Sequence, residues 1–388
     1  MTRLADLINE LCPDGVEYKP LDEVAELKRG QSITKKSITP GDIPVIAGGR
    51  KPAYFTSSAN RTGVTIVVAG SGAYAGFVSY WDQPIFVSDA FSVKVNEEIL
   101  VPRFIYHWMC GKQKELYSLK SGGGVPHVYP KDVAKFKCPI PPLEVQCEIV
   151  RILDQFTTLE AELEAELEAR RTQYEYYRNQ LLSYDALASR VSVKWVKLGE
   201  VASKIITGVT PKAADPKYYQ DATNPWIRTQ DVNFCRINEA SAFVTDQAIA
   251  ELPLKWVSPH SVVVAISGAS AGRSAILNIR AVTNQHCCNI EINSKLADFR
   301  YVYYCIASCY EQLRNLGRGA RGDLNVSIIK SFEIPLPTLD EQRYIADILD
   351  RFDALVNDIS SGLPAEIAAR RAQYEYYRDR LLSFPEKK

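Results

Sequence analysis

Two glycine-rich turns are the segments of this sequence that most resemble phosphate-binding loops. The first, Gly70–Gly76, follows an apolar run that predicts a buried strand, and the second is Gly268–Ser274. A dinucleotide-binding loop needs the spacing Gly-x-Gly-x-x-Gly, and a P-loop needs four residues between its glycines followed by a lysine. The first segment has Gly-x-Gly-x-x-x-Gly, and the second lacks both the P-loop spacing and the lysine. Both segments therefore favour tight turns over nucleotide-binding loops.

Two other segments suggest enzyme or metal chemistry, and both are incomplete. Residues 224–226 (Asn-Pro-Trp) resemble the Asn-Pro-Pro-aromatic loop of amino-methyltransferases, but the second proline is missing and no glycine motif for AdoMet lies nearby. His286 stands beside Cys287 and Cys288, yet the nine cysteines contain no Cys-x-x-Cys, the spacing typical of a structural zinc site. No histidine recurs between the two halves, so a nucleophilic dyad is unsupported. We expect no catalytic residue, no metal site and no cofactor bound by this chain.

Charge is unevenly distributed along the chain although the net charge is zero. From Lys28 to Arg61 there are seven basic residues and one acid, whereas from Glu144 to Arg190 there are ten acids and five bases. The field at a surface follows the local charge, so a neutral total does not exclude a face that binds DNA.

Basic and polar side chains in the loops are the candidates for DNA contact. Lysine and arginine hold phosphates, while asparagine, glutamine and arginine read base edges. The candidates are Lys35, Lys36, Arg50, Lys51, Tyr74, Lys120 and His127 in the first half, and Lys212, Arg228, Gln230, Arg273, Arg318, Arg321 and Asn325 in the second.

One tyrosine-rich segment occurs twice in the chain. Residues 170–183 read Arg-Arg-x-Gln-Tyr-Glu-Tyr-Tyr-Arg-x-x-Leu-Leu-Ser, and residues 370–383 repeat that pattern. Shorter matches link residues 16–25 with 193–202, and 139–156 with 335–352. Each half therefore has a matched start, a variable middle and a matched end, which indicates a two-fold domain duplication rather than a solenoid.

The matched ends are predicted to be long helices. Between Val145 and Leu182 there is no proline or glycine, and apolar residues recur at spacings of three and four, as in a coiled-coil seam. A helix of that length is a rod of roughly 60 Å. The second copy contains Gly362 and Pro364, so we expect that helix to kink or restart near Leu363. We expect the two helices to pair antiparallel, with the two domains at opposite ends and related by a pseudo-two-fold axis.

The variable middles are predicted to be mixed α/β. The segments 64–69 and 261–266 are apolar runs typical of buried strands. The segments 103–109 and 299–304 are typical of aromatic-rich helices, and each is followed by a loop rich in glycine and basic residues.

The duplicated helical segment carries large aromatic and charged side chains on more than one face. Tyr174, Tyr177 and Leu181 share a face that suits the seam between helices. The remaining tyrosine and arginine side chains suit a protein interface, where these residue types are favoured. The candidates for binding a partner are Arg171, Glu175, Tyr176 and Arg178, with their counterparts Arg371, Glu375, Tyr376 and Arg378. Two copies of this face imply two identical partner molecules.

These motifs resemble the DNA-specificity subunits of type I restriction-modification systems. In each half a Pro-x-Pro-x-x-x-x-Gln entry, ending at Gln146 or Gln342, leads into Ile-x-x-Ile-Leu-Asp-x-Phe and then the duplicated segment. The repeat of Leu, Glu and Ala from Leu159 to Leu167 resembles the spacer of one subfamily. The variable middles match nothing sharply, as expected of target-recognition domains.

The resemblance implies a non-catalytic subunit that reads a bipartite DNA target, one half-site for each recognition domain. It would bind two methyltransferase subunits, and restriction subunits would complete an ATP-dependent nuclease. AdoMet, ATP and Mg²⁺ would then be bound by partner subunits. The implied fold is α+β. Two α/β target-recognition domains (residues 1–137, with a short N-terminal segment, and 191–333) would be separated by two long spacer helices (138–190 and 334–388) that form an antiparallel coiled coil.

The expected location is the cytoplasm. No apolar run approaches the roughly 20 residues that span a bilayer, and the cysteine pattern is typical of reduced thiols. Two alternatives remain: a coiled-coil adaptor with two protein-binding heads and no DNA role, and a self-sufficient enzyme. Salt-sensitive binding to duplex DNA would separate the first alternative from a DNA reader. The second would require methylation by the purified chain alone with AdoMet.

Overall fold

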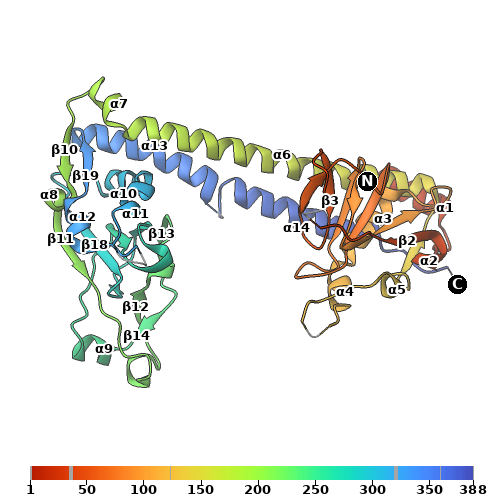
Figure 1. Ribbon diagram of the computed structural model, residues 1–388, viewed down its shortest axis with the longest axis horizontal. Coiled ribbons are helices and arrows are strands. Elements are labelled where there is room, and N and C mark those ends of the chain that lie inside the picture. The colour runs from red at the N-terminus through yellow and green to blue at the C-terminus, as the bar shows by residue number, and fades with distance from the viewer. Residues whose placement is uncertain (1, 35–37, 123, 319–321, 359, 388) are drawn as a thin grey trace. The chain divides into compact units, whose positions relative to one another are not determined.

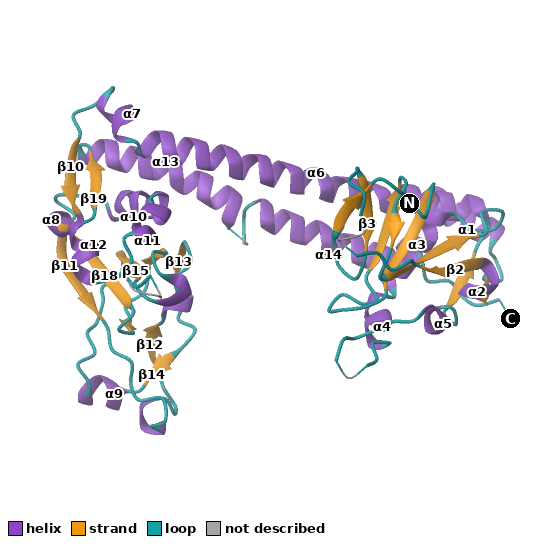
Figure 2. Cartoon of the chain, viewed as in Figure 1, coloured by secondary structure: helices purple, strands orange, loops and turns teal. Residues whose placement is uncertain are grey.

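The computed structural model describes residues 2–34, 38–122, 124–318, 322–358 and 360–387 (Figure 1). The chain divides into two compact units. The first contains Met1–Ala165 and Ala365–Lys388, and the second contains Glu166–Pro364. Figure 2 shows strands and short helices together in each unit. Among the described residues, no helix is both long enough and apolar enough to cross a membrane.

The first unit contains two main sheets. The four-stranded sheet is antiparallel and has the order β2 (Ala25–Arg29), β8 (Ala90–Val95), β5 (Val64–Ala69) and β6 (Val78–Asp82). The three-stranded sheet has the order β4 (Tyr54–Thr56), β3 (Ile43–Ile46) and β7 (Phe86–Val87), with β3 and β7 parallel. β5 confirms the strand predicted at 64–69, because its β-branched residues suit a sheet that is buried on both faces.

Helix α3 (Pro102–Gly111) covers the four-stranded sheet of the first unit. Pro102 stands in the first turn of this helix, where its fixed φ and missing N–H carry no penalty. The helix buries Phe104, Ile105 and Trp108 in the same core as Ile66 of β5. The predicted helix at 103–109 is therefore confirmed, and it is held to the sheet by its apolar face.

The second unit repeats this plan with one more strand. Its five-stranded sheet has the order β11 (Ala202–Thr207), β18 (Cys287–Ile292), β15 (Ser261–Ala265), β16 (Ser274–Leu277) and β13 (Cys235–Ile237). Its three-stranded sheet has the order β14 (Phe243–Val244), β12 (Asn224–Ile227) and β17 (Val282–Thr283). The predicted strand at 261–266 is confirmed as β15.

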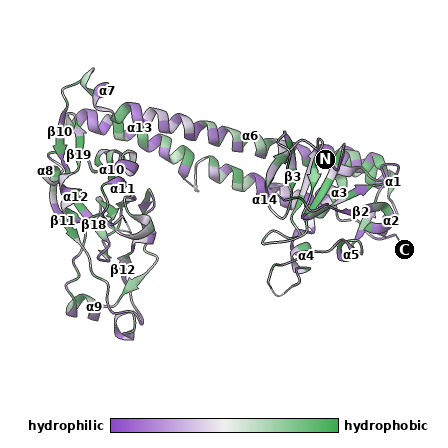
Figure 3. Cartoon of the chain, in the orientation of Figure 1, coloured by the Kyte–Doolittle hydropathy of each residue, from purple (hydrophilic) through white to green (hydrophobic). Residues whose placement is uncertain are grey.

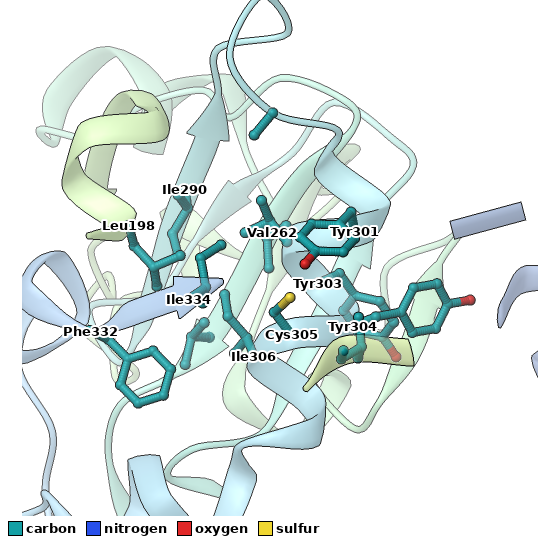
Figure 4. Packing of buried hydrophobic residues seen from close by; sticks show 14 of the residues in the cluster. Leu198, Val262, Ile290, Tyr301, Tyr303, Tyr304, Cys305, Ile306, Phe332 and Ile334 are labelled. Atoms are coloured by element: carbon teal, nitrogen blue, oxygen red, sulfur yellow. The ribbon is translucent and has the colours of Figure 1, made fainter. Parts of the chain in front are cut away.

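Helix α10 (Phe299–Ser308) takes the place of α3 in the second unit. It begins at the N-cap Asp298, whose carboxylate accepts hydrogen bonds from the backbone N–H groups of Arg300 and Tyr301. Its residues Tyr301 and Ile306 lie in the same buried cluster as Val262 and Ile290 of the sheet (Figure 4). In Figure 3 hydrophilic and hydrophobic residues alternate along the ribbons of the long helices.

A short strand precedes each long helix. β1 (Glu17–Pro20) pairs antiparallel with β9 (Lys137–Ile140), and β10 (Lys194–Lys197) pairs antiparallel with β19 (Glu333–Leu336). The expected spacer segments, 138–190 and 334–388, therefore begin in strands, and the helices start at Leu143 and Leu339. The physical reason is the pair of prolines in each entry motif, which favour extended backbone before them and cannot continue a helix.

The long helices end and restart where their residues require it. α6 (Leu143–Leu182) is one helix of 40 residues. α13 (Leu339–Asn357) stops, and α14 (Leu363–Leu381) begins with Pro364 in its first turn, which confirms the predicted restart near Leu363. A Cβ atom on Gly362 would lie 2.4 Å from the carbonyl oxygen of Ala354, so the connection requires glycine.

Each unit contains its own pair of antiparallel helices. In the first unit the rings of Phe156 (α6) and Tyr377 (α14) stack with centroids 5.3 Å apart, and Arg371 of α14 forms ion pairs with Glu160 and Glu164 of α6. In the second unit Tyr174 and Tyr177 of α6 lie beside Phe352 of α13, with ring centroids 6.4 and 6.0 Å apart. The duplicated tyrosines therefore hold an equivalent phenylalanine in both units.

The two ends of the chain meet within the first unit. The N–H of Val16 donates to the carbonyl of Pro385 (2.9 Å), and the N–H of Lys387 donates to the carbonyl of Val16 (2.9 Å). The Tyr18 hydroxyl donates to the carbonyl of Phe384 (3.0 Å). The remaining short helices are α1 (Thr2–Leu11), α2 (Leu21–Val24), α4 (Gln113–Ser118), α5 (Pro130–Val133), α7 (Tyr184–Ala188), α8 (Leu198–Val201), α9 (Asp246–Glu251), α11 (Tyr310–Asn315), α12 (Val326–Ser331), η2 (Pro216–Tyr218), η3 (Thr229–Asp231) and η4 (Gly268–Ser270).

Candidate nucleic-acid interface and partner surface

A buried polar cluster joins α3 of the first unit to the long helices α6 and α14. His107 of α3 is 0% exposed. Its Nε2 lies 2.8 Å from Oδ1 of Asp154 on α6, and its Nδ1 lies 2.7 Å from the hydroxyl oxygen of Tyr374 on α14. Arg103 donates from Nε to the same carboxylate (2.7 Å). The cluster fixes how α3 sits on the helix pair, since a buried polar group must keep its partners.

The second unit builds the same cluster from different side chains. Asp350 of α13, the counterpart of Asp154, accepts a hydrogen bond from the Tyr304 hydroxyl (2.6 Å). It also pairs with Arg236 (2.5 Å) and with Arg300 (3.0 Å). The aspartate of the Ile-Leu-Asp motif is therefore the acceptor that anchors each recognition domain to its helices. The sequence offered one signal for this role, the recurrence of that aspartate in both halves.

Burial and hydrogen bonding shift the pKa values of these groups. Burial lowers the pKa of His107, and it outweighs the hydrogen bond that His107 donates to Asp154, which acts in the opposite direction. Burial raises the pKa of Asp154, but hydrogen bonds from His107 and Arg103 outweigh it, so the net shift is downward. The neutral imidazole therefore donates from Nε2 to Asp154 and accepts from the Tyr374 hydroxyl at Nδ1.

A buried glutamine secures the start of each long helix. The side-chain amide of Gln146 donates to the carbonyls of Ile99 (2.8 Å) and Pro141 (2.7 Å), and its oxygen accepts from the N–H of Val101 (2.8 Å). Gln342 donates to the carbonyl of Pro337 (2.8 Å) and accepts from the N–H of Asp298 (2.9 Å). The glutamine of each entry motif therefore ties the segment before α3 or α10 to the long helix.

The glycine-rich turns have the conformation predicted for tight turns. Gly72 and Gly76 have φ of 82° and 89°, and Gly268 and Gly272 have φ of 72° and 87°. These left-handed values favour glycine at each position. The same turn therefore occurs at the same place in both units.

Four predicted DNA contacts of the first unit, Arg50, Tyr74, Lys120 and His127, lie at or around its turn. The guanidinium carbon of Arg50 lies 5.0 Å from the ring centroid of Tyr74, and Lys120 donates from Nζ to the carbonyl of Ala73 (2.8 Å). His127 pairs through its backbone with Ser121, and its ring lies 6.0 Å from that of Tyr129. Lys51 is exposed. Lys35 and Lys36 lie outside the described residues.

The predicted DNA contacts of the second unit occupy several loops. Arg273 donates to Oδ1 of Asn233 (3.0 Å), and Arg228 donates to the Ser241 hydroxyl (3.1 Å). Arg318 pairs through its backbone with Asp323. Lys212 and Gln230 are exposed. Arg321 lies outside the described residues.

Asn325 has a local structural role. Its side-chain oxygen accepts from the N–H of Ile328 (2.9 Å) and caps α12. That capping bond occupies the oxygen, while the side chain remains exposed.

The predicted partner face is exposed on the duplicated segment. Tyr176 and Tyr376 are 60% and 54% exposed, and Glu175 and Glu375 are also exposed. Arg178 and Arg378 are partly buried, and their guanidinium carbons lie 5.7 and 5.4 Å from the ring centroids of Tyr174 and Tyr374.

Arg171 and Arg371 are equivalent residues of that face, but their surroundings differ between the two copies. Arg371 is held by Glu160 and Glu164, whereas Arg171 lines a cavity of about 480 Å³ together with Tyr174, Glu175 and Arg178. The tyrosines and glutamates are thus the part of the face that is equally accessible in both copies. In the described part of the chain, no cluster of His, Cys, Asp and Glu side chains is arranged to hold a metal ion.

Two globular domains of the same plan, each anchored to a pair of long helices, define a duplicated two-domain protein. Both halves match the type I restriction modification DNA specificity domain, over residues 13–169 and again over 191–369. The chain therefore belongs to the type I restriction-modification DNA specificity family.

A curated relative supports that membership, and solved structures share the fold. The chain is 30% identical to the type I restriction enzyme EcoR124I/EcoR124II specificity subunit of Escherichia coli, over 95% of each chain. Its fold is similar to the crystal structure of the type I restriction-modification S subunit from M. genitalium, with a TM-score of 0.63, 16% identity, and coverage of 95% of this chain and 96% of that one. A second structure, described as the structural basis of complex assembly and conformational transition of the type I R-M system, matches with a TM-score of 0.57 and 19% identity. The match covers 95% of this chain and 98% of that one.

Proposed function

We propose that this chain is the specificity subunit of a type I restriction-modification complex and reads a bipartite DNA target, one half-site for each recognition domain. The observation that carries the proposal is the match of both halves to the same DNA specificity domain. The divergent loops on equivalent frames support it, because two different loop sets suit two different half-sites.

The chain acts without catalytic residues of its own in this proposal. The glycine-rich turns have no nucleotide-loop spacing, and the polar clusters around Asp154 and Asp350 are structural anchors between helices. AdoMet, ATP and Mg²⁺ belong to the methyltransferase and restriction subunits. The cytoplasm is the proposed location, and the free cysteines of the chain support it.

The proposed partners are two methyltransferase subunits, one on each copy of the duplicated segment. Exposed tyrosines are effective interface anchors because they bury a large ring at low entropic cost. Tyr176 and Tyr376 occupy equivalent positions in the two copies, and both rings are exposed. Restriction subunits would add to this core complex.

The test is to express the chain with its methyltransferase subunit and map methylated bases across a genome. The expected result is one motif made of two different half-sites at a fixed spacing. The matched control is the methyltransferase subunit without this chain, which should leave no such motif. A single continuous motif, or the same motif in the control, would contradict the proposal. Duplex binding by the complex should weaken steeply with salt, whereas a protein adaptor would show no salt-sensitive duplex binding.

A further inference from the structure

Arg29 and Asp89 are oppositely charged, exposed side chains that line the same cavity of the first unit. The cavity has a volume of about 220 Å³, and its wall includes His127 and Tyr129. Arg29 is the last residue of β2, and Asp89 directly precedes β8. Both side chains are exposed. They belong to loops and strand ends of the recognition domain, on the side that carries the glycine-rich turn.

Each of these two side chains contacts an uncharged neighbour, Ser71 for Asp89 and Tyr129 for Arg29. The Asp89 carboxylate accepts through Oδ2 from the hydroxyl of Ser71 (2.9 Å), which is itself 8% exposed. The guanidinium carbon of Arg29 lies 5.6 Å from the ring centroid of Tyr129. Within the described part of the chain, neither side chain forms an ion pair, either with the other or with a third residue.

This combination fits a ligand that offers both acceptors and a donor. A bare phosphate is disfavoured, because the Asp89 carboxylate would repel it. A G·C base pair offers the acceptors O6 and N7 on guanine and the amino donor N4 on cytosine in the same groove. Arginine is the commonest partner of guanine O6 and N7, and aspartate accepts from cytosine N4. The two side chains therefore match the two halves of one base pair.

The equivalent place in the second unit carries different chemistry on the same frame. The N–H of Gln31 donates to the carbonyl of Val87, and the N–H of Val209 donates to the carbonyl of Thr283, both at 2.9 Å. Arg29 is paired with Phe91 across the sheet, and Thr207 is paired with Cys288. The strand register therefore places Thr207 of the second unit at the position of Arg29.

The turn that holds Asp89 is also replaced in the second unit. It corresponds to residues 284–286, where Oε1 of Gln285 accepts a hydrogen bond from the hydroxyl of Thr210. The arginine and the aspartate of the first unit are therefore not repeated in the second unit, as expected if equivalent positions read different bases.

We infer that Arg29 and Asp89 read one G·C base pair in the half-site of the first recognition domain. Arg29 donates to guanine O6 and N7, and Asp89 accepts from cytosine N4 through Oδ1. This inference rests on the proposed function and adds to it two residues that determine specificity. Ser71 and Tyr129 act as positioning residues, because they orient the carboxylate and the guanidinium.

The test uses the complex with the methyltransferase subunit and maps methylated motifs for the wild type, Asp89→Ala and Arg29→Ala. The wild-type first half-site should contain an invariant G·C pair. Both variants should lower the preference for G·C at that one position by about 10-fold or more, and the second half-site should stay unchanged. Asp82→Asn removes an exposed carboxylate at the end of β6 and should alter no position.

A second measurement uses the wild-type protein, so that it does not depend on variant folding. Duplexes with 7-deazaguanine in place of each guanine of the target lose the N7 acceptor one position at a time. Binding should fall by about 10-fold at the guanine read by Arg29, and Arg29→Ala should no longer distinguish that duplex from the natural one.

The outcomes separate this inference from the proposed function. A bipartite motif with unchanged base preference in both variants would overturn the reading by Arg29 and Asp89 alone. A first half-site without a G·C pair would do the same. No sequence-specific methylation by the wild-type complex would instead remove the proposed function itself.

Discussion

The hydroxyl oxygen of Tyr374 lies 2.7 Å from Nδ1 of the buried His107. This contact joins the duplicated helical segment to the recognition domain of the first unit. In the second unit the matched tyrosine, Tyr174, lies beside Phe352 instead, whereas both tyrosines have the arginine four residues later over their ring. The same tyrosine of the repeat therefore contacts a buried histidine in one unit and a phenylalanine ring in the other.

Tyr374→Phe should destabilise the first unit by about 1–3 kcal/mol, because it leaves a buried imidazole nitrogen without a donor. The matched variant Tyr174→Phe should cost less, since the ring contacts of Tyr174 survive the change. Denaturant unfolding of both variants, followed by hydrogen exchange of α3 and α10, measures the difference. Equal losses in the two variants would contradict a special role for the contact with His107.

Stability of the first unit should fall as the pH drops below neutrality. Burial lowers the pKa of His107 in the folded chain, so the unfolded chain binds a proton first, near the ordinary histidine value of about 6.5. Folding stability is then lost as the pH falls through that value toward the lower folded pKa. His107→Gln keeps a donor and an acceptor and should flatten this slope in unfolding measured from pH 7.5 to 5.5. A slope unchanged from the wild type would assign the pH dependence to other groups.

Asp154 should affect folding stability over a separate, more acidic pH range. Its pKa is lowered in the folded chain, so its stabilising contribution is present above the ordinary aspartate value and is lost as the pH falls through the folded value. Protonation of the two groups can therefore be separated along one pH series.

Gln146→Leu and Gln342→Leu should each destabilise their unit, because both side chains are 0% exposed and hold backbone groups. Each unsatisfied group costs about 1–3 kcal/mol. Gln146 should cost more, since it satisfies three backbone groups and Gln342 satisfies two. The exposed Gln155 of α6 provides the control, and Gln155→Leu should stay within about 0.5 kcal/mol. Chemical unfolding of the three variants tests the order, and a reversed order would count against this accounting.

Tyr176→Ala or Tyr376→Ala should each remove one bound methyltransferase subunit, and the double variant should remove both. The reason is the loss of an exposed aromatic anchor from each copy of the repeat. Native mass spectrometry of purified complexes measures the stoichiometry. Tyr344→Ala is the control, because Tyr344 is 57% exposed on α13 outside the repeat. Full occupancy in the double variant would place the docking surface elsewhere.

Four residues inserted after Leu163 of α6 should lengthen the gap between the half-sites. They add about 6 Å to the helix and slightly more than one full turn, about 400°, so the packed face is nearly kept. The expected motif has one or two more spacer base pairs and the same half-sites, as read by methylation mapping. A two-residue insertion rotates the helix by about 200° and should disrupt pairing with its partner helix. An altered half-site with an unchanged gap would refute the idea that α6 acts as a ruler.

Local patterns in the sequence determined much of this fold. The repeated segment at 170–183 and 370–383 reveals the duplication, and the apolar runs predict β5 and β15. Glycine and proline predict the restart of the helix near Leu363. These features follow from periodicity and backbone preference, which act over a few residues and can be seen without knowing the path of the chain.

The tertiary structure decided which distant residues meet. His107 and Tyr374 are separated by 267 positions, and Arg29 and Asp89 come from different strand ends of one sheet. The C-terminal helix packs within the first unit rather than with the domain that precedes it in sequence. No local pattern encodes such contacts, because they depend on how strands pair and how helices return across the chain. The loops of the two globular domains differ most between the halves. The shared sheets and helices hold these loops in place, so their side chains can differ without changing the fold.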